Sequence, residues 1–290
     1  MINFGDTIAL NKKAQFYYNR GKFKEAIAWC YEVIKGQPDF VEVYEILGFF
    51  LQLNGDINAA VRAYIKATEI LLDDGSVYSN LDRSLFDEYG SQIFQLVNDN
   101  PGQMSFQEYA YITNVVGRKV PGNFLIFGVG KDSLLWLGVN RGGKTVFLED
   151  DGDWLNQVKV GCENSMEAYL VEYGTRVSLW KSLLAEYSQG NDCLWMVLPE
   201  KVLLTKWDFI LVDAPAGYSE EKPGRMKSIY MTAKLAMESG NTDIFIHDCE
   251  REVENIYSDY FFDKENLINQ VHKLKHYSLK KGVGNAYLKL

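Results

Sequence analysis

Several features are scarce or missing in this 290-residue chain, and each absence narrows the classes of protein it can belong to. Its four cysteines lie far apart without a Cys-x-x-Cys pair, which argues against a zinc knuckle or a disulfide framework and favours reduced thiols. No apolar run approaches the about 18 to 20 residues that span a bilayer. The first ten residues also lack the basic and apolar segments of a signal peptide. The sequence therefore predicts a cytoplasmic protein with no membrane span.

Basic side chains are outnumbered by acidic ones. Thirty lysines and arginines stand against 39 aspartates and glutamates, which gives a formal net charge of −9. Such an average charge repels the phosphate backbone of nucleic acids, so we expect no nucleic-acid partner. The hydrophobic content of 47% is ordinary for a folded protein. At about 100 to 200 residues per domain, the length suggests two domains.

The first part of the chain follows a helical pattern that repeats. Gly21 and Gly55 lie 34 residues apart, the period of a tetratricopeptide repeat. Pro38 ends the first helix pair, because proline cannot donate the next helical hydrogen bond. This resemblance covers residues 7–73, and a diverged capping helix is expected over 79–97. Other positions at the same offset are Phe23 and Ile57, Ala26 and Ala60, Cys30 and Tyr64, and Val33 and Ala67.

Aromatic residues are frequent in these repeats and have two interpretations. Core filling between helices is favoured over a platform for carbohydrate or peptide. The residues concerned are Tyr17, Tyr18, Trp29, Tyr31 and Tyr44.

A turn-rich segment over 98–102 marks the expected domain boundary. Just after it, Ser105 and Glu108 have the spacing of a capping box at the start of a helix. We therefore expect a tetratricopeptide-like helical domain over 1–102 and a second domain over 103–290.

Beyond Pro121, short apolar runs alternate with helical segments, as buried parallel strands and crossover helices do. This alternation predicts an α/β fold, a Rossmann-like doubly wound sheet that binds ligands at the carboxyl ends of its strands. A closing hairpin at the end is the arrangement associated with class I methyltransferases. The expected strands are 124–127, 145–148, 168–171, 209–212, 244–246, 272–279 and 285–290, and the expected helices are 133–139, 154–162, 178–187 and 226–238.

The strongest local motif is an apolar strand that runs into a glycine turn and then a helix. Glycine at positions 128 and 130 lets backbone amides approach a ligand. Glu149, at the end of the next strand, is placed to accept the hydroxyls of a ribose. The pattern alone does not separate NAD from S-adenosylmethionine, although Ser133 in place of a third glycine disfavours a dinucleotide. The candidate cofactor-binding residues are Phe127, Gly128, Gly130, Ser133, Glu149, Asp150 and Asp213.

Two later strands end in residues that can move protons. Asp213 follows one strand, and His247 and Asp248 follow the next. Neighbouring parallel strands bring such residues to one rim of a cleft, so Asp213 and His247 are the candidate catalytic bases. A divalent metal held by Asp213 and Asp248 would serve the same purpose by acidifying a hydroxyl. The alternatives are a structural hydrogen bond for His247 and a helix cap for Asp248.

The polar loop between these two strands supplies candidate contacts to the acceptor. Tyr218, Arg225 and Asp248 are the expected substrate-binding residues, with Arg225 holding an acceptor carboxylate through two hydrogen bonds. The alternative for Arg225 is a surface ion pair with Glu220 or Glu221.

Five blocks, taken in order, resemble the polysaccharide-biosynthesis family that includes the plant glucuronoxylan 4-O-methyltransferases. The resemblance runs through most of residues 105–262 and implies methyl transfer from S-adenosylmethionine to a hydroxyl of a uronic acid or another sugar. Two departures stand out: Lys131 replaces the histidine of the plant glycine motif, and a repeat domain replaces the membrane anchor. The blocks are 123–133, 147–154, 207–218, 223–226 and 243–254.

Three functions therefore remain open. The leading one is an S-adenosylmethionine-dependent O-methyltransferase of saccharides, whose repeats bind a protein partner or mediate self-association. The second is a non-catalytic scaffold in polysaccharide biosynthesis, and the third is a methyltransferase of a peptide or small metabolite. The residues that favour an enzyme are Gly128, Gly130, Glu149, Asp213 and His247.

Overall fold

The chain divides into two units between Arg118 and Lys119 in a computed structural model that describes residues 7–72, 81–161 and 166–280. The expected boundary lay earlier, at residue 102. The difference concerns α6 (Phe106–Gly117), which packs against α4 and α5 of the first unit. Its predicted capping box between Ser105 and Glu108 is present.

Helices alone make up the described part of the first unit, and two successive pairs carry the repeat. Gly21 and Gly55 follow the first helix of each pair, and both have positive φ angles, 62° and 85°. A glycine suits that conformation because it has no Cβ to clash. The helices are α1 (Thr7–Tyr18), α2 (Phe23–Gly36), α3 (Val41–Leu53), α4 (Ile57–Leu71), α5 (Arg83–Asp99) and α6.

The aromatic residues of the repeats are only partly core. Tyr18 and Tyr31 are 48% and 47% exposed, which differs from the expectation that they fill the space between helices. Tyr18 instead faces the partly exposed ring of Phe49, 5.8 Å away between centroids.

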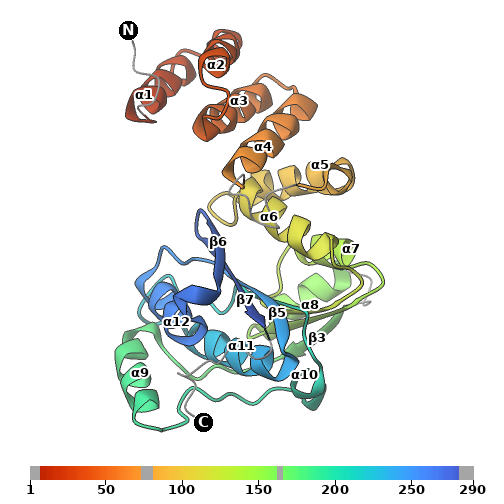
Figure 1. Ribbon diagram of the computed structural model, residues 1–290, viewed down its shortest axis with the longest axis vertical. Helices are drawn as coiled ribbons and strands as arrows, with labels where there is room; N and C mark the ends of the chain where they lie inside the picture. The colour runs from red at the N-terminus through yellow and green to blue at the C-terminus, as the bar shows by residue number, and fades with distance from the viewer. Residues whose placement is uncertain (1–6, 73–80, 162–165, 281–290) are drawn as a thin grey trace. The chain divides into compact units, whose positions relative to one another are not determined.

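The second unit is built on a seven-stranded sheet of order β3-β2-β1-β4-β5-β7-β6. The first five strands are parallel, and β7 pairs antiparallel with β5 (Figure 1). This is the arrangement of class I methyltransferases, so the predicted fold class is confirmed. The strands are β1 (Asn123–Phe127), β2 (Lys144–Glu149), β3 (Glu167–Leu170), β4 (Phe209–Val212), β5 (Asn241–Ile246), β6 (Leu267–Val271) and β7 (Leu274–Lys280).

The closing hairpin starts earlier than the sequence predicted. It joins β6 to β7 through a turn at His272, whereas we expected the segment 272–279 to pair with a strand over 285–290. Residues 285–290 lie outside the described part of the chain.

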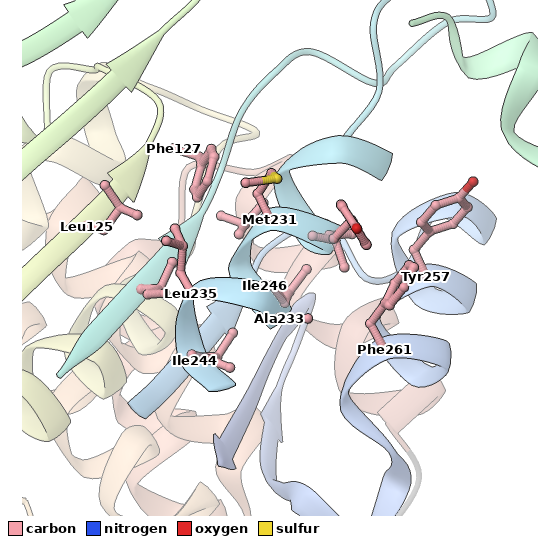
Figure 2. Close-up of a cluster of buried hydrophobic side chains, with 14 of the residues drawn as sticks. Leu125, Phe127, Met231, Ala233, Leu235, Ile244, Ile246, Tyr257 and Phe261 are labelled. Carbon is pink, nitrogen blue, oxygen red and sulfur yellow. The ribbon is translucent and has the colours of Figure 1, made fainter. Parts of the chain in front are cut away.

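Each face of the sheet carries its own apolar layer. On one face, side chains of β1 and β5 meet α11 and α12, as Figure 2 shows for Phe127, Ile246, Met231 and Phe261. On the other face, the ring of Phe124 packs edge-on against Trp136. Burial on both faces explains why the strands are continuous apolar runs. The helices are α7 (Ser133–Val139), α8 (Gly152–Gly161), α9 (Trp180–Ser188), α10 (Glu200–Leu204), α11 (Met226–Ser239) and α12 (Glu252–Phe262), with short 3-10 turns η1 (Val177–Leu179) and η2 (Lys264–Asn266).

Among the described residues, no helix has the length and apolar character needed to cross a membrane. The three cysteines that the structure describes, Cys30, Cys193 and Cys249, are free of disulfide bonds.

Candidate functional site

The glycine turn after β1 is held by its own side chains and backbone. Gly128 has a φ of 120°, where a larger residue would be strained, and its amide donates to the Leu148 carbonyl at 2.7 Å. A Cβ placed on Gly130 would lie 2.5 Å from Oδ1 of Asp132. Gly130 thus makes room for the Asp132 carboxylate, a role that the sequence did not indicate.

Two residues predicted to touch the cofactor are buried around this turn. Phe127 belongs to the apolar layer against α11 (Figure 2). The Ser133 hydroxyl accepts the Gly130 amide at 3.1 Å. Both side chains are buried and support the turn, and a direct contact of either residue with the cofactor stays a prediction.

Glu149, the candidate ribose ligand, uses much of its hydrogen-bonding capacity within the protein. Its Oε2 accepts the Val129 amide at 2.9 Å, and its Oε1 accepts the amides of Asp150 and Asp151, each at 3.0 Å. Burial raises the pKa of this carboxyl above its usual value. Glu149 thus ties the turn after β1 to the turn after β2. One lone pair on Oε2 remains for a ribose hydroxyl, and the neighbouring Asp150 is exposed.

At the carboxyl ends of β4 and β5, the residues Asp213, His247 and Asp248 come together as the sequence predicted. His247 Nδ1 lies 2.9 Å from Asp213 Oδ1 and 3.5 Å from Asp248 Oδ1. Burial alone would raise the pKa of Asp213, but His247 and Arg225 bring it below its usual value. The Asp213 side chain is 26% exposed and that of His247 only 2%. Asp213 is therefore the member of this pair that reaches solvent.

Arg225 occupies a different place from the one we expected. Its guanidinium is buried and donates to Asp213 Oδ1 at 3.1 Å, to Asp248 Oδ2 at 2.6 Å and to the carbonyls of Pro215 and His247. Four of its five N–H groups are thus engaged inside the protein. This corrects both expectations for Arg225, the contact to an acceptor carboxylate and the surface pair with Glu220 or Glu221. An exposed pair at the loop joins Glu221 to Arg176 instead.

Asp248 is strained as well as buried. Its φ angle is 63°, in the left-handed region that aspartate adopts far less readily than glycine. Its carboxylate pairs with Arg225 and, at 2.9 Å, with Nη1 of Arg251. These contacts hold the strained backbone in place, and they leave the side chain in neither a helix cap nor an exposed acceptor contact.

Two carboxylates that the sequence did not single out belong to the same region. The partly exposed Asp132 directly precedes α7, yet its carboxylate caps no amide and accepts Trp136 Nε1 at 3.0 Å. Burial, and then the negative charge of Asp213, raise the pKa of Asp132 to about 6.

Glu254, in the first turn of α12, is the second. Within the described part of the chain, neither of its buried oxygens has a hydrogen-bond partner, and burial raises its pKa. A Cβ on Gly217 would lie 2.7 Å from Glu254 Oε1, so the loop passes directly over this carboxylate.

The charge of the assembled groups has a clear sign. Asp132, Asp213, Asp248 and Glu254 provide four carboxyl groups, whereas Arg225, Arg251 and a protonated His247 provide at most three positive charges. The excess of negative charge favours a cationic ligand and disfavours a pyrophosphate. Asp213, His247 and Asp248 also offer ligand atoms that all lie within 4.8 Å of one another, a spacing that can hold a metal ion.

Tyr218 lies on the loop above these groups and is 70% exposed. The ammonium of Lys222 sits 5.3 Å from the centre of its ring. Tyr218 thus keeps the exposed position expected of an acceptor contact, which stays a prediction.

The sequence profile of the IRX15/IRX15L/GXM family matches residues 107–277. The chain belongs to this family. Every residue of the site just described lies within the matched segment, and so does all of α6 except its first residue, although α6 packs with the first unit. The family region and the compact units therefore divide the chain at different points.

Relatives from Arabidopsis thaliana include named methyltransferases. Glucuronoxylan 4-O-methyltransferase 1 is 38% identical over 191 residues, which are 60% of this chain and 67% of the relative. Arabinogalactan O-methyltransferase 2 is 34% identical over 245 residues, 76% of this chain and 84% of the relative. Protein IRX15-LIKE, whose name states no reaction, is 33% identical over 198 residues, 61% of this chain and 62% of the relative.

Among solved structures, the citrinin polyketide synthase CMeT domain matches with a TM-score of 0.33 and 13% identity over 80% of this chain and 54% of that chain. A likeness this low says nothing about the site of the IRX15/IRX15L/GXM family member described here.

Proposed function

We propose that this protein transfers the methyl group of S-adenosylmethionine to a hydroxyl of a saccharide. The observation that carries the proposal is the excess of carboxylates at the carboxyl ends of β1, β4 and β5, where a doubly wound sheet binds its ligand. S-adenosylmethionine brings a sulfonium and an ammonium and fits this charge. The anionic pyrophosphate of NAD does not.

When bound, S-adenosylmethionine supplies an electrophilic methyl group. The protein's own residues orient the reaction. Glu149 holds two turns together through three backbone amides and keeps one lone pair for a ribose hydroxyl. The carboxylates around Asp213 balance positive charge at the rim. Positioning of this kind accounts for much of the rate of a transfer between two bound reactants.

Asp213 is the proposed base that takes the proton of the acceptor hydroxyl. It is the exposed member of the Asp213–His247 pair, and a base has to lie within hydrogen-bond reach of the hydroxyl. His247, predicted from the sequence as an alternative base, is enclosed and hydrogen-bonded to Asp213 at 2.9 Å. We therefore propose that His247 orients the Asp213 carboxylate rather than touching the acceptor.

The acceptor is proposed to be a hydroxyl of a uronic acid or another sugar. Support comes from relatives named for glucuronoxylan and arabinogalactan. Tyr218 offers an exposed ring at the loop on which a sugar can stack. Since Arg225 is committed inside the protein, an acceptor carboxylate would have to pair with a cation elsewhere on the loop, such as Lys222.

A divalent metal is a second ligand that Asp213, His247 and Asp248 suit by their spacing. Arg225 competes with such an ion, because it already donates to Asp213 Oδ1 and Asp248 Oδ2. We therefore propose weak metal binding at this place. Calorimetry with Mn²⁺ tests it, and tight binding by the wild-type protein would contradict the competition.

For the repeats we propose a role in binding an acidic protein partner. Residues 7–24 contain five lysines and arginines and no acidic residue, although the whole chain carries a net charge of −9. Within this basic segment lies the exposed Tyr18, whose ring is near that of the exposed Phe49. Light scattering of wild type and Tyr18→Ala separates this role from self-association, with Tyr31→Ala as the control. A loss of mass in Tyr18→Ala alone would favour self-association. The cytoplasmic location stays a prediction.

The deciding experiment is calorimetry with S-adenosylmethionine and with NAD, followed by a mass-based screen of glucuronate-bearing and neutral oligosaccharides. We expect binding of S-adenosylmethionine alone and a mass gain of one methyl group on a saccharide. Absence of donor binding by the folded protein would favour a non-catalytic scaffold, and transfer to a peptide would overturn the saccharide assignment.

A further inference from the structure

Asp132 lies where the glycine turn opens onto the site, and its conformation is unusual. The residue occupies the position before α7 at which aspartate commonly accepts a backbone amide. Its carboxylate makes no such bond. Instead Oδ2 accepts the indole N–H of Trp136 at 3.0 Å, and Oδ1 lies over Gly130, 2.5 Å from the point where a Cβ would be.

These contacts fix the Asp132 carboxylate in one orientation. Trp136 is almost fully buried and cannot follow a moving partner, so the indole N–H holds Oδ2 in place. Gly130 leaves the room that Oδ1 needs. A side chain fixed before its ligand arrives loses little entropy on binding, which is the property of a preorganised binding group.

Asp132 also lies close enough to Asp213 for the charge of one to act on the other. The two residues follow neighbouring parallel strands, β1 and β4, which pair from Phe124 with Phe209 to Phe127 with Val212. Asp132 is partly exposed, and the Asp213 side chain is 26% exposed. The two negative charges repel each other, and a cation bound at Asp132 would relieve that repulsion.

We propose that Asp132 binds the α-ammonium group of the methyl donor. This inference rests on the proposed function, because it assumes that S-adenosylmethionine is the donor. The glycine turn, to which Asp132 belongs, is on the donor side of the site, whereas the loop with Tyr218 is the proposed acceptor side. An ammonium bound to a carboxylate is held by charge-assisted hydrogen bonds, the strongest ordinary kind.

The test compares two ligands that differ by one amino group. S-adenosylhomocysteine carries the ammonium, and its des-amino analogue keeps the carboxylate, the sulfur and the adenosine. We expect Asp132→Asn to weaken S-adenosylhomocysteine by about 10- to 100-fold in calorimetry. The same variant should bind the des-amino analogue as wild type does. Asparagine retains an oxygen that can accept the Trp136 indole N–H, so the turn should stay folded.

Asp153→Asn is the matched control, because it removes an exposed carboxylate from the same unit. It should leave both affinities unchanged. An equal loss for the two ligands in Asp132→Asn would overturn the proposal and assign Asp132 a structural role. Unchanged affinity for both, with a loss of turnover, would also overturn it and place Asp132 with the acceptor's proton. Failure of wild type to bind either ligand would refute the proposed function itself.

Discussion

The sheet contains two pairs of aspartate and histidine, one at each end of β5. At the carboxyl end, His247 Nδ1 lies 2.9 Å from Asp213 Oδ1, and Arg225 donates to the same carboxylate. Near the amino end, His276 Nε2 lies 3.2 Å from Asp243 Oδ1, and the ammonium of Lys119 pairs with Asp243 Oδ2. The two places thus share their residue types and their spacing.

They differ in exposure and in charge balance. Asp243 and His276 are closed off from solvent, and Lys119 supplies a positive charge for the single carboxylate. Asp213 reaches solvent and belongs to a group in which carboxylates outnumber guanidiniums. The difference teaches that an aspartate–histidine pair is no signature of catalysis in itself. An exposed aspartate and an unbalanced charge distinguish the pair proposed to act in catalysis from the enclosed one.

Among the substitutions that test the contrast between the two pairs, Asp213→Asn should have the largest effect. The variant removes the proposed base, so turnover should fall by about 10²- to 10⁴-fold. Steady-state transfer assays measure the loss, and thermal unfolding checks that the fold persists. Near-normal turnover would remove Asp213 from the chemistry and make the two pairs equivalent.

Asp243→Asn should affect stability rather than activity. Removing the charge of Asp243 weakens the hydrogen bond to the buried His276 and the ion pair with the half-exposed Lys119, at a cost of about 1 to 3 kcal/mol in the free energy of unfolding. Chemical denaturation measures the cost, and calorimetry should give the donor affinity of wild type. A specific loss of donor binding in the folded variant would mean that the amino end of β5 contributes to the site.

The pH dependence of stability sharpens the contrast further. Burial would raise the pKa of Asp243, but hydrogen bonds and charges from His276 and Lys119 lower it to about 2. A carboxyl with a lowered pKa contributes stability above its unfolded value of about 3.9, and loses that contribution as the pH falls towards 2. Wild type should therefore lose about 2 kcal/mol between pH 4 and pH 2 that Asp243→Asn does not lose, as acid unfolding curves would measure. Parallel curves would refute the assignment.

At the carboxyl ends of the strands, we expect a smaller pH effect, on donor affinity rather than on stability. Burial and Asp213 raise the pKa of Asp132 to about 6, so the residue loses its proton as the pH rises from 5 to 7. Since the charged form attracts a cationic donor, binding should tighten over this range, by at most about tenfold per unit. Calorimetry of wild type and Asp132→Asn tests this, and an equal slope in both would exclude Asp132 as the cause.

The smallest effect is expected from Glu254→Gln. A buried carboxylate without a hydrogen bond has a raised pKa, so its stabilising contribution is present at low pH and is lost as the pH rises above its unfolded value. Glutamine keeps the shape without the charge. The midpoint of thermal unfolding at pH 7.5 should therefore equal or exceed that of wild type. A marked decrease would show that Glu254 has a stabilising partner at neutral pH.

Local patterns predicted much of the fold. The 34-residue interval placed Gly21 and Gly55 in equivalent turns, and the apolar runs located five parallel strands within a few residues. The strand β6 escaped notice because it is a half-buried edge strand with an irregularity between Leu267 and Asn269, so its apolar pattern is weak.

The sequence predicted which residues of the site lie near one another better than it predicted which partners their side chains contact. Strand ends brought Asp213, His247 and Asp248 together as expected. Arg225 stands beside acidic and basic loop residues that suggest a surface, and its burial depends on groups 10 to 23 residues away. Asp132 looked like an ordinary residue before a helix, because its neighbour Asp213 is distant in the sequence. Such long-range placement has no local signal.

The loop between β4 and α11 is closed at its base by the protein itself. The Gly224 amide donates to the Ala216 carbonyl at 2.9 Å, and the Arg225 guanidinium reaches back to the Pro215 carbonyl at 3.3 Å. Residues 217–223 therefore leave and re-enter the domain at one fixed point. The loop is tied down along its length as well, because the amides of Val177 and Ser178 donate to the carbonyls of Lys222 and Glu220 at 2.8 and 3.1 Å. An exposed side chain such as Tyr218 can therefore be exchanged without moving the loop, whereas an insertion or deletion would break these bonds.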